Sequence, residues 1–406
     1  MPDPILHLIL SCLPTTEDVV RTSILSTRWR YLWTSVSSLD IDCSRGKKRF
    51  KKIMFKEFVN SVLLNKTLDL VSFRLCCLNH YDVSTVTQWI QEAIMRNVKS
   101  LDLMFSPRVK FGVISAVPTP FYLVTVDSLE VLRLCLYGHS LRASDGTRFR
   151  ALRVLELNQV DCFDVDLVEQ CLEKSPLLEE LSLIDCLIKI VDPVCISSPK
   201  LKSLIIRNWK NVVYKCERFW CGLEISCPEL LFFEYVGRKG EFILKNVDSL
   251  KKTLIFPEDT LQQKVSPRLG KAMCKLLAGI SHVESLSLNL YFIRCIDAAC
   301  DPDRNFPASF PNLKKLEEHL MTDYWVLDEV ETRRILTRHL KKVEFLEFNG
   351  EKLKLDIACF LLEQGNLLEE MVFRWDYEYH EKAKKAVNKM SKLNKASSTV
   401  KLISVL

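Results

Sequence analysis

The chain has 406 residues, of which 48% are hydrophobic and 27% charged, so it is long enough for a large core or for two to three domains. Its net charge is +6, and the segment 381–401, with seven lysines and one glutamate, carries all of that excess. A nucleic-acid-binding protein needs basic charge spread over its contact surface, so we expect no nucleic acid as a partner. No run of about 18 apolar residues is present, and we expect no membrane span.

The cysteine pattern indicates reduced thiols. Sixteen cysteines show no recurrent paired spacing of the kind that a disulfide scaffold has. Cys216, Cys221 and Cys227 cluster, but they lack a CxxC spacing and a nearby histidine, so we expect no metal site and no cofactor. These features favour a reducing compartment, nucleus or cytoplasm.

The first 25 residues predict two short helices. Asp3 is a possible cap for a helix that starts at Pro4 and ends before Pro14. This helix is apolar on two sides and should be buried. It carries Asp3 and His7 and lacks a basic leading region, so it does not resemble an export signal. A second helix, about 16–25, should follow a threonine cap and place Val19, Val20, Ser23 and Ile24 inward.

The stretch TSILSTRWRYLWTSV, residues 22–36, predicts a third short helix. Its apolar stripe edged with arginine is Leu25, Arg28, Trp29, Leu32 and Trp33. Such a stripe can stack on bases, form half of a protein contact, or be internal core. Three short helices seldom bury enough surface to be stable alone, so we expect a protein partner.

The stretch PDPILHLILSCLPTTEDVVRTSILSTRWRYLWTSV resembles the F-box, with its IL, LP, V-x-x-S-x-L-S and R-W-R-x-L-W landmarks. Met1 stands where the family has a leucine before Pro2. The resemblance implies docking on a Skp-family adaptor, and through it on a cullin. The adaptor-facing residues that it implies are Pro2, Ile5, Leu6, Ile9, Leu10, Leu13, Pro14, Leu25, Trp29, Leu32 and Trp33.

A basic segment follows the F-box pattern of residues 1–40. SRGKKRFKK is either a nuclear-targeting cluster or the solvated entry to a helix, FKEFVNSVLL. We assign residues 41–66 to this linker and helix.

A leucine pattern, L-x-x-L-x-L, then recurs at 98, 129, 152, 178, 201 and 283, with weaker copies near 230, 313, 343 and 369. The periods are irregular, as in leucine-rich repeats. Because one strand and its return segment cannot bury their own leucines, stacked repeats must share a core. We predict an α/β fold, with a curved parallel sheet and helical or irregular return segments over 67–310.

Residues between the inward leucines should lie on the concave face of that sheet. Their mixture of charged, small and apolar groups suits a protein surface better than a phosphate backbone, although a plain solvated sheet fits the same pattern. The candidate target face is Asp102, Arg133, Glu156, Ser182, Ile205, Glu234 and Ser287.

The C-terminal region, 311–406, resembles a plant FBD module in LKKVEFLEFNGEKLKLDIACFLLEQGNLLEEMVF. It predicts a strand, a loop with Gly350, a helix over about 354–364 and a strand, which continue or cap the repeats. A lysine-rich helix over 380–395 should follow, with Ala383, Val387, Met390 and Leu393 on its apolar side. F-box, repeats and FBD in this order are similar to one plant family along essentially the whole chain.

The sequence contains no Gly-rich phosphate loop, HExxH or GxSxG pattern, and we expect no catalytic activity. The resemblance implies a non-catalytic substrate receptor of a Skp–cullin–F-box ubiquitin ligase that holds an unknown target protein. The alternative is a leucine-rich-repeat binding scaffold without a ligase role.

Overall fold

The structure is a computed structural model of the chain. It describes residues 2–45, 52–78, 83–106, 121–123, 127–139, 141–143, 148–162, 166–188, 194–208, 222–238, 242–258, 267–289, 292, 310, 312–313, 315–319, 342–345, 348, 355, 358–359, 361–363, 368–375, 380–393 and 395–405. The chain divides into two compact units, Met1–Lys189 with Ser198–Leu201, and Ile190–Ser197 with Lys202–Leu406.

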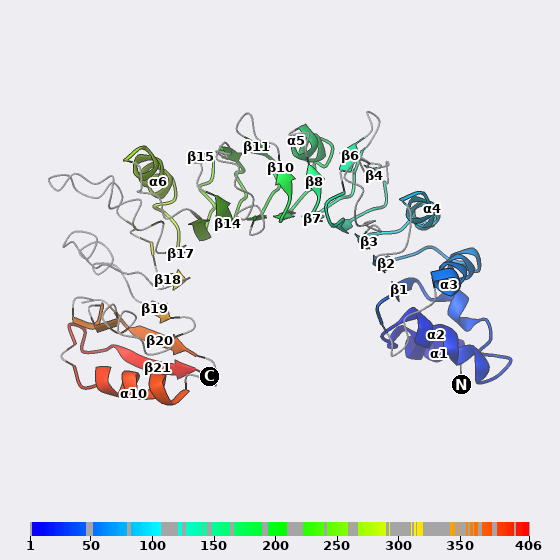
Figure 1. Cartoon of the computed structure of the whole chain (residues 1–406), viewed down its shortest axis with the longest axis horizontal. Helices are drawn as coiled ribbons and strands as arrows, with labels where there is room; N and C mark the ends of the chain where they lie inside the picture. Colours follow the sequence, from blue (N-terminus) through cyan, green and yellow to red (C-terminus); the bar gives the residue numbers. More distant parts are fainter. Residues whose placement is uncertain are drawn as a thin grey trace, which may run out of the picture. The chain divides into compact units, whose positions relative to one another are not determined.

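Unit 1 begins with two α-helices, α1 (Asp3–Ser11) and α2 (Thr16–Arg21) (Figure 1). Thr15 caps α2 as predicted, because its hydroxyl accepts a hydrogen bond from the Asp18 N–H at 3.1 Å. Asp3 does not cap α1, since it is itself the first residue of that helix. The helix α2 ends earlier than predicted, so Ile24 is exposed instead of buried.

The predicted third helix is replaced by tighter turns. Two 3₁₀ helices, η1 (Thr22–Ile24) and η2 (Leu32–Ser35), flank a turn that follows the same i to i+3 bonding. The Trp29 N–H bonds to the Ser26 carbonyl and the Leu32 N–H to the Trp29 carbonyl, at 3.1 and 3.3 Å. A 3₁₀ turn has about three residues, not 3.6. Leu25 is exposed and lies outside the predicted stripe, whereas Trp29, Leu32 and Trp33 pack against one core.

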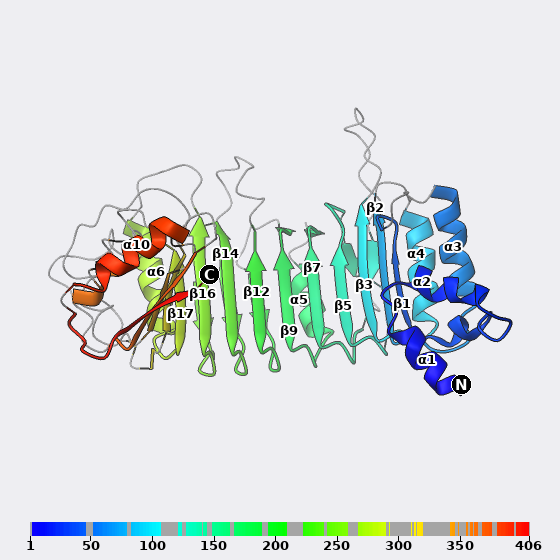
Figure 2. The same ribbon diagram turned by 90° about the horizontal axis from the view of Figure 1, so that it is seen from below.

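The sheet of unit 1 is parallel and runs in the order β1, β2, β3, β5, β7, β9 (Figure 2). Its strands are β1 (Ser38–Asp42), β2 (Ser72–Leu78), β3 (Ser100–Ser106), β5 (Val131–Cys135), β7 (Val154–Asn158) and β9 (Glu180–Ile184). The helices α3 (Lys52–Leu64), α4 (Val83–Ile94) and α5 (Asp166–Glu173) lie on one face of it. Two short parallel ladders, β4 (Phe121–Leu123) with β6 (Leu141–Ala143) and β8 (Asp161–Cys162) with β10 (Leu187–Ile188), accompany the return segments.

Unit 2 repeats the same plan. Its long parallel sheet contains β12 (Ser203–Arg207), β14 (Phe232–Arg238), β16 (Lys252–Glu258), β17 (Ser285–Asn289), β18 (Lys315–His319), β19 (Lys342–Phe345), β20 (Glu370–Arg374) and β21 (Lys401–Val405). A second parallel ladder joins β11 (Val194–Ser197), β13 (Leu223–Ser226) and β15 (Phe242–Lys245), and α6 (Pro267–Gly279) packs against β15.

Each stronger or weaker L-x-x-L-x-L copy forms a strand, as predicted. In these strands the leucines are buried and alternate with partly exposed residues, so the core lies on one face of each sheet. The mixed α/β fold with parallel sheets is therefore confirmed.

Four strands of the long parallel sheets were not predicted, β1, β2, β16 and β21, and neither were the short strands of the return segments, β4, β6, β8, β10, β11, β13 and β15. One apolar position in β1 holds isoleucine (Ile41) and one in β2 holds phenylalanine (Phe73) in place of leucine, and in β16 the middle position is Thr253. A template that accepts any residue able to fill the same volume would have found β1 and β2, because the shared core requires bulk and not leucine itself.

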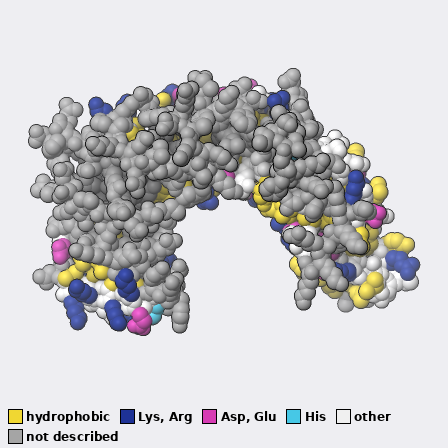
Figure 3. Space-filling view, in the orientation of Figure 1, with side chains coloured by type: hydrophobic (Ala, Val, Ile, Leu, Met, Phe, Trp, Pro, Cys, Tyr) yellow, Lys and Arg dark blue, Asp and Glu magenta, His cyan; other side chains and the backbone are white. Residues whose placement is uncertain are grey.

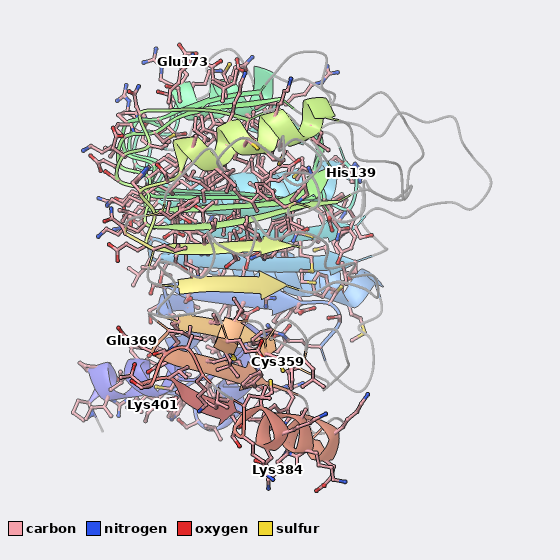
Figure 4. The ribbon with its side chains drawn as sticks, turned by 90° about the vertical axis from the view of Figure 1, so that its left-hand side faces the viewer. His139, Glu173, Cys359, Glu369, Lys384 and Lys401 are labelled. Carbon is pink, nitrogen blue, oxygen red and sulfur yellow. The ribbon has the colours of Figure 1, made fainter. Side chains whose placement is uncertain are left out.

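The C-terminal part of unit 2 has its own core around Phe345, Phe373 and Trp375. The helix α10 (His380–Met390) contributes Ala383, Ala386, Val387 and Met390, and Leu393 packs against them. Figure 4 shows Lys384 on the solvent side of α10 and Cys359, which packs against this core. Described residues 355, 358–359 and 361–363 are helical, as predicted, whereas Gly350 lies outside the described residues.

The described cysteines are free thiols, and Cys227 is buried among them; Cys216 and Cys221 lie outside the described residues. Within the described part of the chain, no group of three or more His, Cys, Asp or Glu is placed to hold a metal ion. No helix in that same part is long and apolar enough to cross a bilayer.

Candidate protein-interaction surfaces

The segment that resembles an F-box, residues 1–40 and called the F-box segment below, has a small core of its own. Leu10, Val19 and Val36 are buried together, and Leu13, Trp29, Leu32 and Trp33 pack against them while staying partly accessible. Leu6 is buried as well. The structure therefore places Leu6 and Leu10 inside the chain and not on an outward surface, and each tryptophan is at least partly core.

The other side of α1 is exposed. Ile5, Ile9 and Leu8 are accessible, with 64% of Leu8 open to solvent. Exposing three large aliphatic side chains on one short helix leaves apolar area in water, which is unfavourable at about 25 cal/mol per Å². Leu8 was not in the predicted adaptor-facing set. It follows Ile5 by three residues, however, and residues three apart lie on the same side of a helix.

An ion pair joins the start of α1 to the turn that precedes η2. The Arg28 guanidinium donates to the Asp3 carboxylate through Nε, at 3.0 Å, and this partner holds the pKa of Asp3 below its usual value. Pro2 precedes Asp3, while Leu25 and Tyr31 flank Arg28, so one pairing places these chain segments together. All three are exposed.

We call the resulting set the N-terminal apolar surface. Figure 3 shows hydrophobic side chains on the outside of the N-terminal region. Its members, all exposed, are Pro2, Ile5, Leu8, Ile9, Ile24, Leu25 and Tyr31. Pro14, also predicted, is exposed at the other end of α1.

The F-box segment is joined to the first repeats by polar contacts. The Thr16 hydroxyl accepts a hydrogen bond from the Asp40 N–H at 2.8 Å, which ties α2 to β1. The buried Lys66 ammonium donates to the Trp33 and Val36 carbonyls at 2.9 and 2.6 Å and lies over the Trp33 ring. The Val71 N–H bonds to the Ser37 carbonyl at 2.7 Å. These contacts hold the F-box segment against the start of the sheet.

The predicted target-face residues of unit 1 lie in one row. Strand register pairs Asp102 with Arg133, Arg133 with Glu156, and Glu156 with Ser182. The same row continues to Arg74 and Asp40, which were not predicted because their strands, β2 and β1, were not.

The charges in this row alternate in sign. Arg74 pairs with Asp40 at 3.1 Å and with Asp102 at 3.3 Å, and Arg133 lies 3.5 Å from Glu156. These groups are about one third exposed or more, so each pair contributes little to stability. A row of accessible, alternating charges is suited to fixing the register of a bound polypeptide.

In unit 2 the corresponding row is less accessible. Ile205 pairs in register with Glu234, and Glu234 with Leu254, which pairs with Ser287. Glu234 is only 5% exposed and bonds to Arg207, and Ser287 is fully buried. Of the predicted positions in this unit, only Ile205 is open to a target.

Comparison with known proteins agrees with this arrangement. An F-box domain model matches residues 1–40, a model described as "FBD-associated F-box protein At5g56370, LRR repeats" matches 86–218, and an FBD model matches 334–373. The chain thus carries an F-box, leucine-rich repeats and an FBD region, as the sequence resemblance indicated.

Its homologues are FBD-associated F-box and leucine-rich-repeat proteins of Arabidopsis thaliana. The chain is 24% identical to FBD-associated F-box protein At5g22730, over 99% of this chain and 93% of the relative. It is 27% identical to FBD-associated F-box protein At1g66310, over 94% and 90%, and 33% identical to F-box/FBD/LRR-repeat protein At4g00160, over 63% and 55%. These domains support a general F-box adaptor role, and an F-box implies binding of a Skp-family adaptor.

Proposed function

We propose that this chain is the substrate-recognition subunit of a Skp–cullin–F-box ubiquitin ligase. In this role the N-terminal apolar surface docks on a Skp-family adaptor, and the charged row of unit 1 contacts a target protein. The chain contributes proximity, because holding a target lysine beside a charged ubiquitin raises its effective concentration without a catalytic group from the receptor.

The observation that carries the proposal is the exposure of Ile5, Leu8, Ile9 and Leu25 on a segment whose core is nearly complete without them. Exposed aliphatic clusters of this kind mark protein contacts. Burial of Leu6 and Leu10 limits the docking surface to the outward side of α1 and the turn that Arg28 holds beside it.

The test is binding of the full chain to a purified Skp-family adaptor. Ile5→Asp is suitable because the third residue of a helix tolerates an acidic group, which the helix dipole favours. Leu25→Asp lies in the neighbouring turn. We expect each to weaken adaptor binding about 30-fold or more, the loss typical of a central apolar contact.

Leu177→Asp is the matched control, since Leu177 is a similarly exposed leucine of unit 1 in the turn before β9. It should leave the affinity unchanged. The Ile5→Asp and Leu25→Asp proteins can be compared only if they keep the wild-type melting temperature. If such proteins bind the adaptor as well as the wild type does, the alternative function, a leucine-rich-repeat scaffold that has no ligase role, describes the chain better.

A further inference from the structure

Two thiols meet at the carboxyl end of the first two strands. Cys43 directly follows β1, and its N–H bonds to the Cys76 carbonyl on β2 at 3.0 Å. The register Asp42 to Cys76 places Cys43 one residue beyond the partner of Cys76. With a strand spacing of about 4.8 Å and a rise of about 3.3 Å per residue, their Cα atoms lie about 6 Å apart, within the range of a disulfide.

The Cys43 side chain lies against β2, beside Cys76. The Leu78 N–H donates to Cys43 Sγ at 3.2 Å, and the nearness of the two sulfurs shifts the pKa of both thiols. Cys43 is half-buried, so a small reagent can reach it, whereas Cys76 is buried. The Met104 thioether lies 3.7 Å from Cys76 Sγ on the next strand.

The two thiols ionise very differently. The hydrogen bond from Cys76, together with that from the Leu78 amide, lowers the pKa of Cys43 to about 7 although burial and Asp42 oppose this. The bond to Cys43 and burial raise the pKa of Cys76, and Asp42 adds to that effect. Cys43 therefore supplies the thiolate and Cys76 the proton donor.

We propose that Cys43 and Cys76 form a thiol pair that a hydroperoxide oxidises to a disulfide, with Cys43 as the reacting thiol and Cys76 as the resolving thiol. The Cys43 thiolate attacks one peroxide oxygen, the O–O bond breaks, and the leaving alkoxide or hydroxide takes up a proton, which leaves a sulfenic acid. Cys76 Sγ then attacks the Cys43 sulfur, the S–O bond breaks, and the departing hydroxide takes the Cys76 proton as water. Two thiols and one hydroperoxide thus give one disulfide, one alcohol or water, and one further water.

The position gives this bond a structural consequence. The disulfide joins the end of β1, which follows the F-box segment, to β2. The loop of chain that it closes contains α3. Oxidation therefore restrains the junction that connects the adaptor-docking part to the repeats. The inference does not depend on the ligase assignment, because it concerns thiols outside both interaction surfaces.

The first experiment treats the reduced full chain with one equivalent of hydrogen peroxide, blocks remaining thiols with N-ethylmaleimide, and digests with trypsin. We expect peptide 31–45 linked to peptide 75–96 with loss of two hydrogens. Cys43→Ser and Cys76→Ser should abolish the link. Cys77→Ala is the matched control, since Cys77 is adjacent in sequence but buried on the opposite, core-facing side of β2, and it should retain the link.

A second experiment needs no variant. Alkylation of Cys43 by iodoacetamide should rise with pH through about 7, and at pH 7 Cys43 should react roughly five- to tenfold faster than the exposed Cys12 of the same molecule. A link through Cys77, the absence of any link, or a Cys43 rate no higher than that of Cys12 would overturn the proposal.

Discussion

The Lys66 ammonium donates a hydrogen bond to the Val36 carbonyl, 2.6 Å away. This bond joins the end of the F-box segment to the loop between α3 and β2. The same ammonium bonds to the Trp33 carbonyl. Burial lowers the pKa of Lys66 to about 8, because a charged amine is costly to remove from water.

Replacing Lys66 by methionine should destabilise unit 1 by about 1–3 kcal/mol, since two carbonyl oxygens lose a donor while the aliphatic volume is kept. Chemical denaturation at pH 7 measures this. A stability equal to that of the wild type would show that the lysine contacts are replaceable by water.

The same residue predicts a pH dependence. The folded pKa of about 8 lies below the unfolded value of 10.5, so between these two values the unfolded chain binds more protons and the lysine contribution to stability rises with pH. The wild type should therefore gain stability relative to Lys66→Met from pH 8 to pH 10. A parallel pH profile for both proteins would contradict the assignment.

The two sides of α1 should respond in opposite ways to truncation. Leu10→Ala removes a fully buried side chain and should cost about 2–5 kcal/mol of unfolding free energy, whereas exposed Leu8→Ala should change it by less than about 0.5 kcal/mol. Adaptor binding should show the reverse order once unfolded protein is discounted. Equal effects of both changes on stability would mean that Leu8 is buried in solution.

Arg207 and Glu234 provide a test of the buried charge in unit 2. Arg207→Met leaves the Glu234 carboxylate without its main partner and should destabilise the protein by about 3–5 kcal/mol. The double change Arg207→Met with Glu234→Met removes both charges and should recover most of that loss. A double variant as unstable as the single one would refute this reading of the pair.

The charged row of unit 1 should affect target capture more than stability. Arg133→Glu places an acidic group between Asp102 and Glu156, so that three acidic groups lie in a row. It should reduce labelling of a captured target by a proximity-labelling enzyme fused to the chain. Arg133→Glu combined with Glu156→Arg restores opposite charges between β5 and β7 but leaves an acidic group beside Asp102, so the melting temperature should return part of the way to the wild-type value while capture stays low. Recovery of capture by the double swap would indicate that the row only stabilises the sheet.

Much of the repeat architecture could be predicted without coordinates. A strand with buried residues at every second position needs a shared core, and this requirement made the L-x-x-L-x-L copies identifiable as strands. β1 and β2 were not predicted because one apolar position in each is not leucine, although Phe73 and Ile41 fill the same kind of position. The capped start of α2 was predictable because Thr15 acts through its immediate neighbours.

The sequence by itself determined the order of F-box, repeats and FBD region, the parallel strands, and the apolar side of α10, since each follows from local spacing. Only the tertiary structure decided which apolar side of α1 is core, that Glu234 and Ser287 are buried, and that Cys43 lies beside Cys76. These outcomes depend on contacts between residues far apart in the chain, and spacing along one segment carries no information about which distant segment will cover it.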